Sequence, residues 1–314
     1  MALLAAALGL LLAAAPADDW EPQAPPRPTA WSLAGAGHWS ICTRFESRAR
    51  ATLLERDSFH GDDKDADLRR LRRTGQEWIT ACPGGPSVLV FSAMVALVQP
   101  RPLPPYSAPV EAFADFAAEL AESRAEIRAM LARAAEESRR RGVAPPPLYH
   151  YALAWAAVSL GELDVARREL ARAYHTGHVE PWRLELVSGV IALLAGDVDQ
   201  ALQLSRGAVA ETRGSLQSSS AFLLALAYER AGAPDHAARI LDDHHARLLS
   251  GEMLLEQLLP LHERLYLSAF HQETAGNVAD AIRYWEVYLD RPEPEEPERQ
   301  SAQRHLEALR VGKR

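Results

Sequence analysis

A spacing of glycine and alanine that repeats four times constrains the fold of this chain more than any other feature. A Gly is followed five residues later by an Ala in the segments GELDVA, GDVDQA, GAPDHA and GNVADA, which begin at Gly161, Gly196, Gly232 and Gly276. The four glycines lie 35, 36 and 44 residues apart. A period of this length is typical of proteins built from stacked two-helix units, so the sequence predicts repeated helical hairpins.

The residue types in the repeat suit such a hairpin. Gly allows the positive φ that a tight helix end requires, and the Ala five residues later lets two crossing helices approach closely. Asp197 and Asn277 directly follow a Gly and can cap the next helix. The longer last step, which includes residues 248–259, predicts an extended loop between the third and fourth hairpins.

The segments LAWAAVSLGELDVARRELARA (153–173) and LSAFHQETAGNVADAIRYWEVYL (267–289) resemble tetratricopeptide (TPR) repeats in their order of small residue, Gly, Ala and large apolar residue. The resemblance covers about four repeats within residues 148–291. It implies an all-α fold that contains a right-handed α-solenoid of TPR-like hairpins. The small-residue positions of the repeat are occupied by Ala154, Gly189, Ala225 and Ala269, and the later Ala position by Ala173 and Ala208.

In this family the first helix of each repeat lines the concave face of the array. The resemblance therefore places these residues in a groove that would bind an extended or helical peptide segment: Tyr151, Trp155, Leu186, Val190, Phe222, Leu226, Tyr266 and Phe270. The alternative is that these side chains pack against neighbouring helices, because large apolar residues at helical spacing are commonly core residues.

The rest of the chain divides at its prolines. Residues 18–37 form a Pro-rich tether, and residues 38–99 form an N-terminal helical segment with Pro83 and two glycines as an internal break. A second Pro-rich linker spans residues 100–109. Residues 110–147 contain a long helix and its connection, with the helix ending at Arg139-Arg140-Arg141-Gly142. Residues 292–314 are expected to supply a C-terminal capping helix.

The first seventeen residues have the composition of a secretory signal peptide. An Ala/Leu-rich run is followed by Ala15-Pro16-Ala17, which resembles a cleavage site, although no Lys or Arg precedes Arg27. The alternative is a disordered, Ala-rich start. We expect an exported, periplasmic or secreted protein, and a run this short is not expected to remain as a membrane anchor.

The chain has two cysteines, Cys42 and Cys82. In an exported protein an even number of cysteines favours a disulfide, which would close a loop of about 40 residues and stabilise the fold by about 4 kcal/mol. Two buried free thiols are the alternative.

Other chemistry has little support in the sequence. The formal net charge of −8 disfavours nucleic-acid binding, and hydrolase and nucleotide-binding motifs are missing. The histidines lack metal-ligand spacing, so no metal or cofactor is expected. The basic run Arg69-Arg70-Leu71-Arg72-Arg73 is interpreted as a solvated helix face, with contact to an anionic polymer or membrane as the less favoured alternative.

These observations predict a non-catalytic scaffold or adaptor of the cell envelope that binds a protein or peptide partner. Two alternatives stay open: a structural component that contacts glycan or lipid and has no peptide groove, and an accessory subunit of a separate enzyme. Membrane contact is not favoured.

Overall fold

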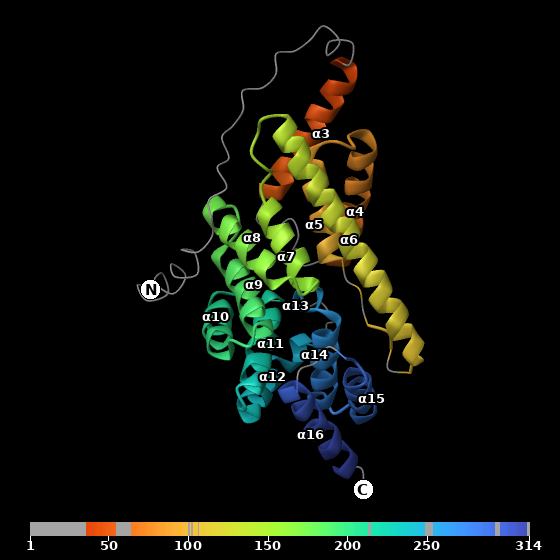
Figure 1. Ribbon diagram of the computed structural model, residues 1–314, viewed down its shortest axis with the longest axis vertical. Coiled ribbons are helices and arrows are strands. Elements are labelled where there is room, and N and C mark those ends of the chain that lie inside the picture. Colours follow the sequence, from red (N-terminus) through yellow and green to blue (C-terminus); the bar gives the residue numbers. More distant parts are fainter. Residues whose placement is uncertain are drawn as a thin grey trace. The chain divides into compact units, whose positions relative to one another are not determined.

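The computed structural model describes residues 36–54, 64–99, 101, 103–105, 107–212, 215–248, 254–292 and 296–312 (Figure 1). All regular secondary structure in these ranges is helical, which confirms the predicted all-α class. The predicted signal peptide and residues 18–35 of the predicted tether lie outside the described residues. Within the described ranges, no helix combines the length and the apolar character that a membrane span requires.

The N-terminal part consists of α3 (Ala36–Leu54), α4 (Lys64–Ala81), α5 (Pro86–Val98) and α6 (Val110–Arg140). The predicted break at Pro83 separates α4 from α5. The predicted long helix is α6, and it ends as expected: Gly142 has a φ of 65° and donates to the carbonyl of Arg139 at 3.0 Å. Because glycine has no Cβ, Gly142 can adopt this left-handed backbone conformation and end the helix without a steric penalty.

The helices that follow lie where the helical hairpins are predicted, but a short helix occupies residues 254–258 of the predicted extended loop, and residues 249–253 of that loop lie outside the described residues. The helices are α7 (Tyr149–Ser159), α8 (Leu163–Thr176), α9 (Pro181–Leu194), α10 (Val198–Glu211), α11 (Ser215–Arg230), α12 (Pro234–Leu248), the short α13 (Leu254–Leu258), α14 (Leu261–Thr274), α15 (Val278–Leu289) and α16 (Glu296–Gly312). Helix α9 packs on α10, α11 on α12, and α14 on α15, while α16 packs on α15 (Figure 1).

The four repeated glycines all end a helix in the same way. Their φ angles are 74°, 75°, 72° and 76° in chain order. In each turn the Gly N–H donates to the carbonyl three residues earlier, and the next N–H donates to a carbonyl five residues earlier, at 2.8–3.0 Å. This is the Schellman pattern. The alanines of the repeat are fully buried, as predicted: Ala166, Ala201, Ala237 and Ala281.

Two further predictions about the hairpins have different outcomes. Asp197 caps α10, because its Oδ1 accepts from the N–H of Gln200 at 3.1 Å. Asn277 was expected to cap α15 in the same way, but its side chain makes no capping hydrogen bond. It donates instead to Gln272 Oε1 at 2.8 Å, across the turn.

The described residues belong to two compact units. Unit 1 comprises the residues up to Ala96, Arg128–Ala154 and Arg167–Val179, and unit 2 comprises Leu97–Ile127, Trp155–Ala166 and Glu180 onward. The first division lies close to the predicted Pro-rich linker. That linker also makes contacts within unit 2, where the carbonyl of Pro104 accepts from Tyr284 Oη at 3.1 Å.

Candidate functional site

The side chains predicted to line a groove are core residues in the structure. Each has at most 4% of its surface exposed: Tyr151, Trp155, Leu186, Val190, Phe222, Leu226, Tyr266 and Phe270. Trp155 Nε1 donates to the main-chain carbonyl of Gln257 at 3.3 Å, and the Tyr266 ring packs edge-on against Trp285 with centroids 4.8 Å apart. The structure therefore agrees with the alternative interpretation of this stripe, in which it packs against neighbouring helices.

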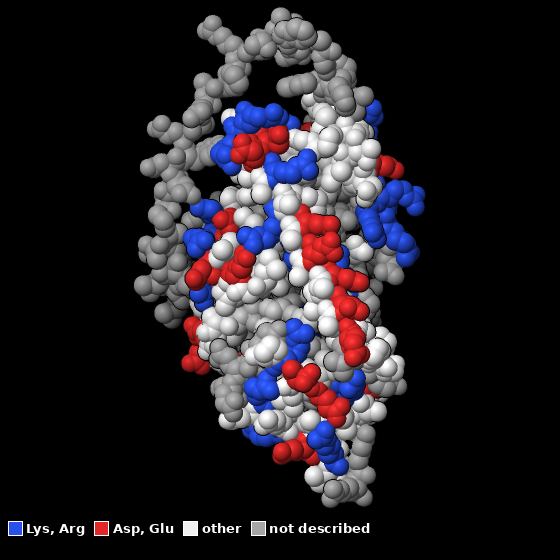
Figure 2. All heavy atoms as spheres, turned by 45° about the vertical axis from the view of Figure 1, so that its right-hand side comes forward, with Lys and Arg blue, Asp and Glu red and all other residues white. Residues whose placement is uncertain are grey.

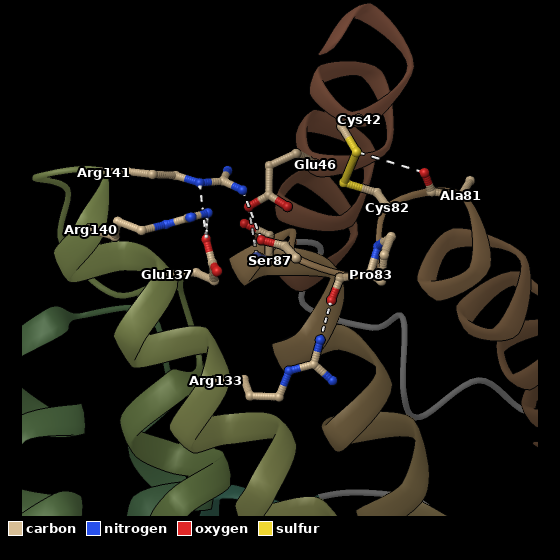
Figure 3. Close-up of a disulfide and its surroundings, with 11 residues drawn as sticks. Cys42, Glu46, Ala81, Cys82, Pro83, Ser87, Arg133, Glu137, Arg140 and Arg141 are labelled. Atoms are coloured by element: carbon tan, nitrogen blue, oxygen red, sulfur yellow. Dashed lines mark hydrogen bonds and ion pairs between the residues drawn. A yellow bond between two sulfur atoms is a disulfide. The ribbon is translucent and has the colours of Figure 1, made fainter. Parts of the chain in front are cut away.

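The two cysteines form a disulfide, as expected for an exported chain. Cys42 of α3 is bonded to Cys82, which directly follows α4, and their Cα atoms are 5.0 Å apart (Figure 3). The loop after Cys82 is also fixed by polar contacts. Glu46 Oε1 accepts from the N–H of Ser87 at 2.7 Å, and Arg133 donates to the carbonyl of Pro83 at 2.8 Å (Figure 3). The disulfide and these hydrogen bonds therefore hold α3 and the loop between α4 and α5 together.

The best candidate for a binding site is an open pocket in unit 2, with a volume of about 550 Å³. One wall is the C-terminal end of α11 and its turn, and the other is one face of α16. The lining residues are Glu229, Arg230, Gly232, Glu298, Gln300, Ser301, Gln303, Arg304 and Glu307. Three of them are carboxylates and two are arginines, so the lining is polar and strongly charged.

A buried network centred on His305 holds this wall of α16 in place. His305 Nε2 lies 3.1 Å from Glu229 Oε1, and His305 Nδ1 lies 3.0 Å from the carboxylate of Glu273. Ser301 Oγ donates to Glu229 Oε1 at 2.8 Å. The imidazole also stacks on the Trp285 ring at 5.1 Å, and Trp285 Nε1 donates to Glu273 at 3.1 Å. Helices α11, α14, α15 and α16 each contribute a residue.

The geometry requires a protonated His305. Both ring nitrogens face carboxylate oxygens, and only an imidazolium has two N–H donors. Burial alone would lower the pKa of His305, but the hydrogen bonds and charges of Glu229 and Glu273 raise it to about 9. Burial would likewise raise the pKa of Glu229, yet the bonds from His305 and Ser301 lower it below its ordinary value. The pair is therefore ionised at neutral pH.

Arg230 fixes the other side of the pocket. Its Nη2 donates to both carboxylate oxygens of Glu263 at 3.0 Å, and its Nη1 lies 3.3 Å from Glu298 Oε1. The guanidinium also lies over the Tyr266 ring, 4.4 Å from its centroid. Burial would lower the pKa of Arg230, but the charge of Glu263 is the largest of the effects that raise it. Arg230 therefore remains a cation at any accessible pH.

The network has the residue types of a nucleophile site without its geometry. Ser301 Oγ donates to Glu229 and makes no described hydrogen bond to His305. A general base must accept a proton from the nucleophile. Both ring nitrogens of His305 are instead hydrogen-bonded to the carboxylates of Glu229 and Glu273. The arrangement attaches α16 to α11 and α14 and places one face of α16 beside the open pocket.

Sequence reasoning missed this site. Glu229 and His305 are 76 residues apart, and nothing in their local surroundings indicates that they meet. A weak signal was present, because Ser301 and His305 are four residues apart and so share one face of the predicted capping helix. That face alone could not identify the partners on α11 and α14.

Other charged groups are less organised. The described residues contain no group of three or more His, Cys, Asp or Glu side chains able to hold a metal ion. The arginines of the basic run are exposed on α4: Arg69, Arg70, Arg72 and Arg73. Figure 2 shows a row of Asp and Glu on the visible face and groups of Lys and Arg beside it.

Comparisons with known proteins give no relative from which to assign a function: no protein-family model matches the chain, and no curated protein or solved structure matches it significantly.

Proposed function

We propose that this chain is an exported, non-catalytic adaptor built on a TPR-like solenoid, and that it binds a polar, charged segment of a partner protein in the α11–α16 pocket. The observation that carries the proposal is the pocket itself, whose walls are held rigid by the His305 and Arg230 networks. The binding surface thus differs from the aromatic stripe that the family resemblance implies.

The chemistry of the pocket favours a protein segment over a small molecule. Small-molecule sites are lined mainly by apolar and aromatic side chains, whereas this lining is mostly charged or amide-bearing. Gln300, Gln303, Arg304 and Glu307 are exposed on α16 and offer both donors and acceptors to a ligand. A segment with charges of both signs would complement them.

Preorganisation supports binding at this place. Ordering a flexible side chain on binding costs about 0.5–1.5 kcal/mol. Glu229, Arg230 and Ser301 already have fixed partners, so they need not be ordered when a ligand enters. The exposed Gln303, Arg304 and Glu307 side chains of α16 would lose freedom.

Export is supported by two features. The disulfide is of a kind that persists in oxidising compartments, and the first seventeen residues resemble a signal peptide. A non-catalytic role is supported by His305, whose two ring nitrogens both face carboxylates, so that it is not positioned to accept a proton from Ser301.

The test is co-purification from the native host. The full-length chain is expressed as wild type and with Arg304→Glu and Glu307→Lys, both of which change exposed pocket charges. The control is Glu119→Lys, which makes the same Glu-to-Lys change on an exposed position of α6. We expect a partner that is retained by wild type and by the control but lost from the pocket variants.

Retention of every partner by both pocket variants would exclude the pocket as the docking site. Circular dichroism and the melting temperature confirm that each variant is folded before partners are compared. The two pocket substitutions lie on the surface and should change stability by less than about 0.5 kcal/mol.

A second candidate function rests on the arginines of α3 and α4. The described side chains of these two helices include seven exposed arginines and only two carboxylates, Glu46 and Glu77. The arginines are Arg44, Arg48, Arg50, Arg69, Arg70, Arg72 and Arg73. Over their full sequences the two helices contain eight Lys or Arg and four Asp or Glu, and this excess of positive charge favours contact with an anionic envelope polymer or lipid. If Ala at the four arginines of α4 leaves binding to anionic vesicles unchanged, the arginines are a solvated face.

A further inference from the structure

Arg124 is a buried cation with very little hydrogen bonding. It lies on α6 within unit 2 and has 1% of its surface exposed. Its Nη2 donates to the main-chain carbonyl of Gln257 at 2.9 Å. Its Nε and Nη1 are fully buried and have no hydrogen-bond partner. A guanidinium has five N–H donors, so most of the hydrogen-bonding capacity of Arg124 is unused.

Two other arginines lie nearby. Arg264 of α14, also 1% exposed, donates to the main-chain carbonyl of Arg101 and lies over the Phe116 ring, 5.3 Å from its centroid. Arg101 has a buried Nε without a hydrogen-bond partner. Burial, followed by the charges of Arg101 and Arg264, lowers the pKa of Arg124 to about 10.

Within the part of the chain that the structure describes, the positive charge of Arg124 and Arg101 has no ion-pair partner. No carboxylate of the described residues forms an ion pair with Arg124 or Arg101. At a pKa of about 10, Arg124 stays protonated at neutral pH, so it cannot avoid the penalty by losing its proton. Burying an unpaired charge is unfavourable, and natural proteins usually pair such groups or use them to hold a ligand. A bound anion would supply the missing charge.

We propose that Arg124 and Arg101 form a binding site for a small divalent oxyanion of the phosphate or sulfate class. Nε and Nη1 of Arg124 and Nε of Arg101 would donate to its oxygens, and Arg264 would add to the attraction. Arginine binds tetrahedral oxyanions well because its donors are fixed and always charged. Two charges match the pair Arg124 and Arg101, whereas a single carboxylate would leave one of them uncompensated. This site is independent of the α11–α16 pocket.

The test measures the melting temperature of the full-length protein as sodium phosphate replaces sodium chloride at constant ionic strength and pH. A ligand that binds only the folded state raises stability as its concentration exceeds its Kd. We expect the melting temperature of wild type to rise by several degrees at about 100 times the Kd, and isothermal titration calorimetry to give one phosphate per chain. Arg124→Gln should lose both responses.

Two variants keep the result interpretable. Arg128→Gln changes an exposed arginine one turn further along α6 and should keep the full phosphate response. Arg101→Gln changes a residue outside the helices and should weaken the phosphate response. It replaces Arg124→Gln as the test variant if Arg124→Gln does not fold. The proposal is overturned if phosphate has no more effect than chloride, or if wild type and the folded variants respond equally. An equal response to acetate would also overturn it, because the site would then recognise carboxylates.

Discussion

At the scale of single residues, His305 explains how α16 is attached to the preceding helices. Its two nitrogens connect α11 to α14, and this requires the imidazolium form. Because the folded pKa of about 9 lies above the unfolded value of 6.5, this contribution to stability is complete below pH 6.5 and is lost as pH rises through 9. Glu229 has the opposite dependence, since its lowered pKa makes its contribution disappear at acid pH.

His305→Gln should therefore destabilise the protein in a pH-dependent way. Below pH 6.5 the loss of the imidazolium should cost on the order of 3 kcal/mol, which is the free energy that corresponds to the shift from 6.5 to about 9. The difference from wild type should shrink between pH 6.5 and pH 9. Urea unfolding at pH 6 and pH 9.5 measures the difference in the free energy of unfolding between wild type and the variant. An equal difference at the two pH values would rule out the charged network.

Gly189 shows why small residues recur on the first helix of each hairpin. A methyl group at this position would come within 2.9 Å of Leu223 Cδ2, in the packing between α9 and α11. Gly189→Ala should destabilise the protein by about 1–3 kcal/mol through overpacking. The control is Gly207→Ala, whose added methyl would meet only the end of the flexible Glu185 side chain. That variant should stay within about 1 kcal/mol of wild type, and equal losses would contradict the packing argument.

At the scale of elements, the disulfide fixes the position of α3 relative to the end of α4. Replacing Cys42 and Cys82 with Ser opens a loop of 40 residues and should lower stability by about 4 kcal/mol in the chain-entropy model. Denaturant unfolding checks this value, and dithiothreitol should lower the stability of wild type but leave that of the double variant unchanged. If dithiothreitol lowers the stability of both proteins equally, its effect does not come from the Cys42–Cys82 disulfide.

Helix α6 carries an exposed acidic face over its first four turns. Its carboxylates, all of them exposed, are Glu111, Asp115, Glu119, Glu122 and Glu126. A row of acidic side chains is visible on the surface in Figure 2. Like charges four residues apart destabilise a helix by a few tenths of a kcal/mol per pair.

Asp115→Lys should relieve this repulsion, because it places a cation between Glu111 and Glu119. We expect stability to rise by about 0.5–1 kcal/mol at low salt, and by less in 1 M NaCl, where surface charges are screened. Asp115→Asn should give an intermediate gain. Thermal melts at both salt concentrations measure the effect, and an equal gain at both would indicate a cause other than charge.

The helices were predictable because their signals are local. Each repeated Gly marks a helix end by its own conformation, and each Ala marks a close helix crossing. The prediction that Asn277 caps α15 was wrong, because its side-chain amide donates to Gln272 across the turn instead. The pocket was not predictable, because Glu229 and His305 come together only through packing over 76 residues.

The aromatic stripe illustrates the limit of a family resemblance. Position in the repeat identified Tyr151 and Tyr266 as first-helix residues, but their exposure depends on what else packs there. The Tyr266 hydroxyl bonds to Ser301 of α16 at 3.2 Å, so the capping helix covers this position. A repeat pattern does not encode that contact.

At the scale of the whole molecule, stacked helices place charged side chains of α11 and α16 around one open pocket. Glu229 and Arg230, which already have hydrogen-bond and ion-pair partners, line one wall, and exposed residues of α16 line the other. We therefore place the proposed partner recognition at the C-terminal end of unit 2.

Site-specific photo-crosslinking in the native host tests this claim most directly. A photoreactive amino acid replaces Gln303 in the pocket or, as the matched control, Gln203, which is exposed on α10. We predict that a partner protein is crosslinked at position 303 and not at 203, and that Arg304→Glu removes the crosslink. A partner crosslinked at position 203 but not at 303 would contradict the account.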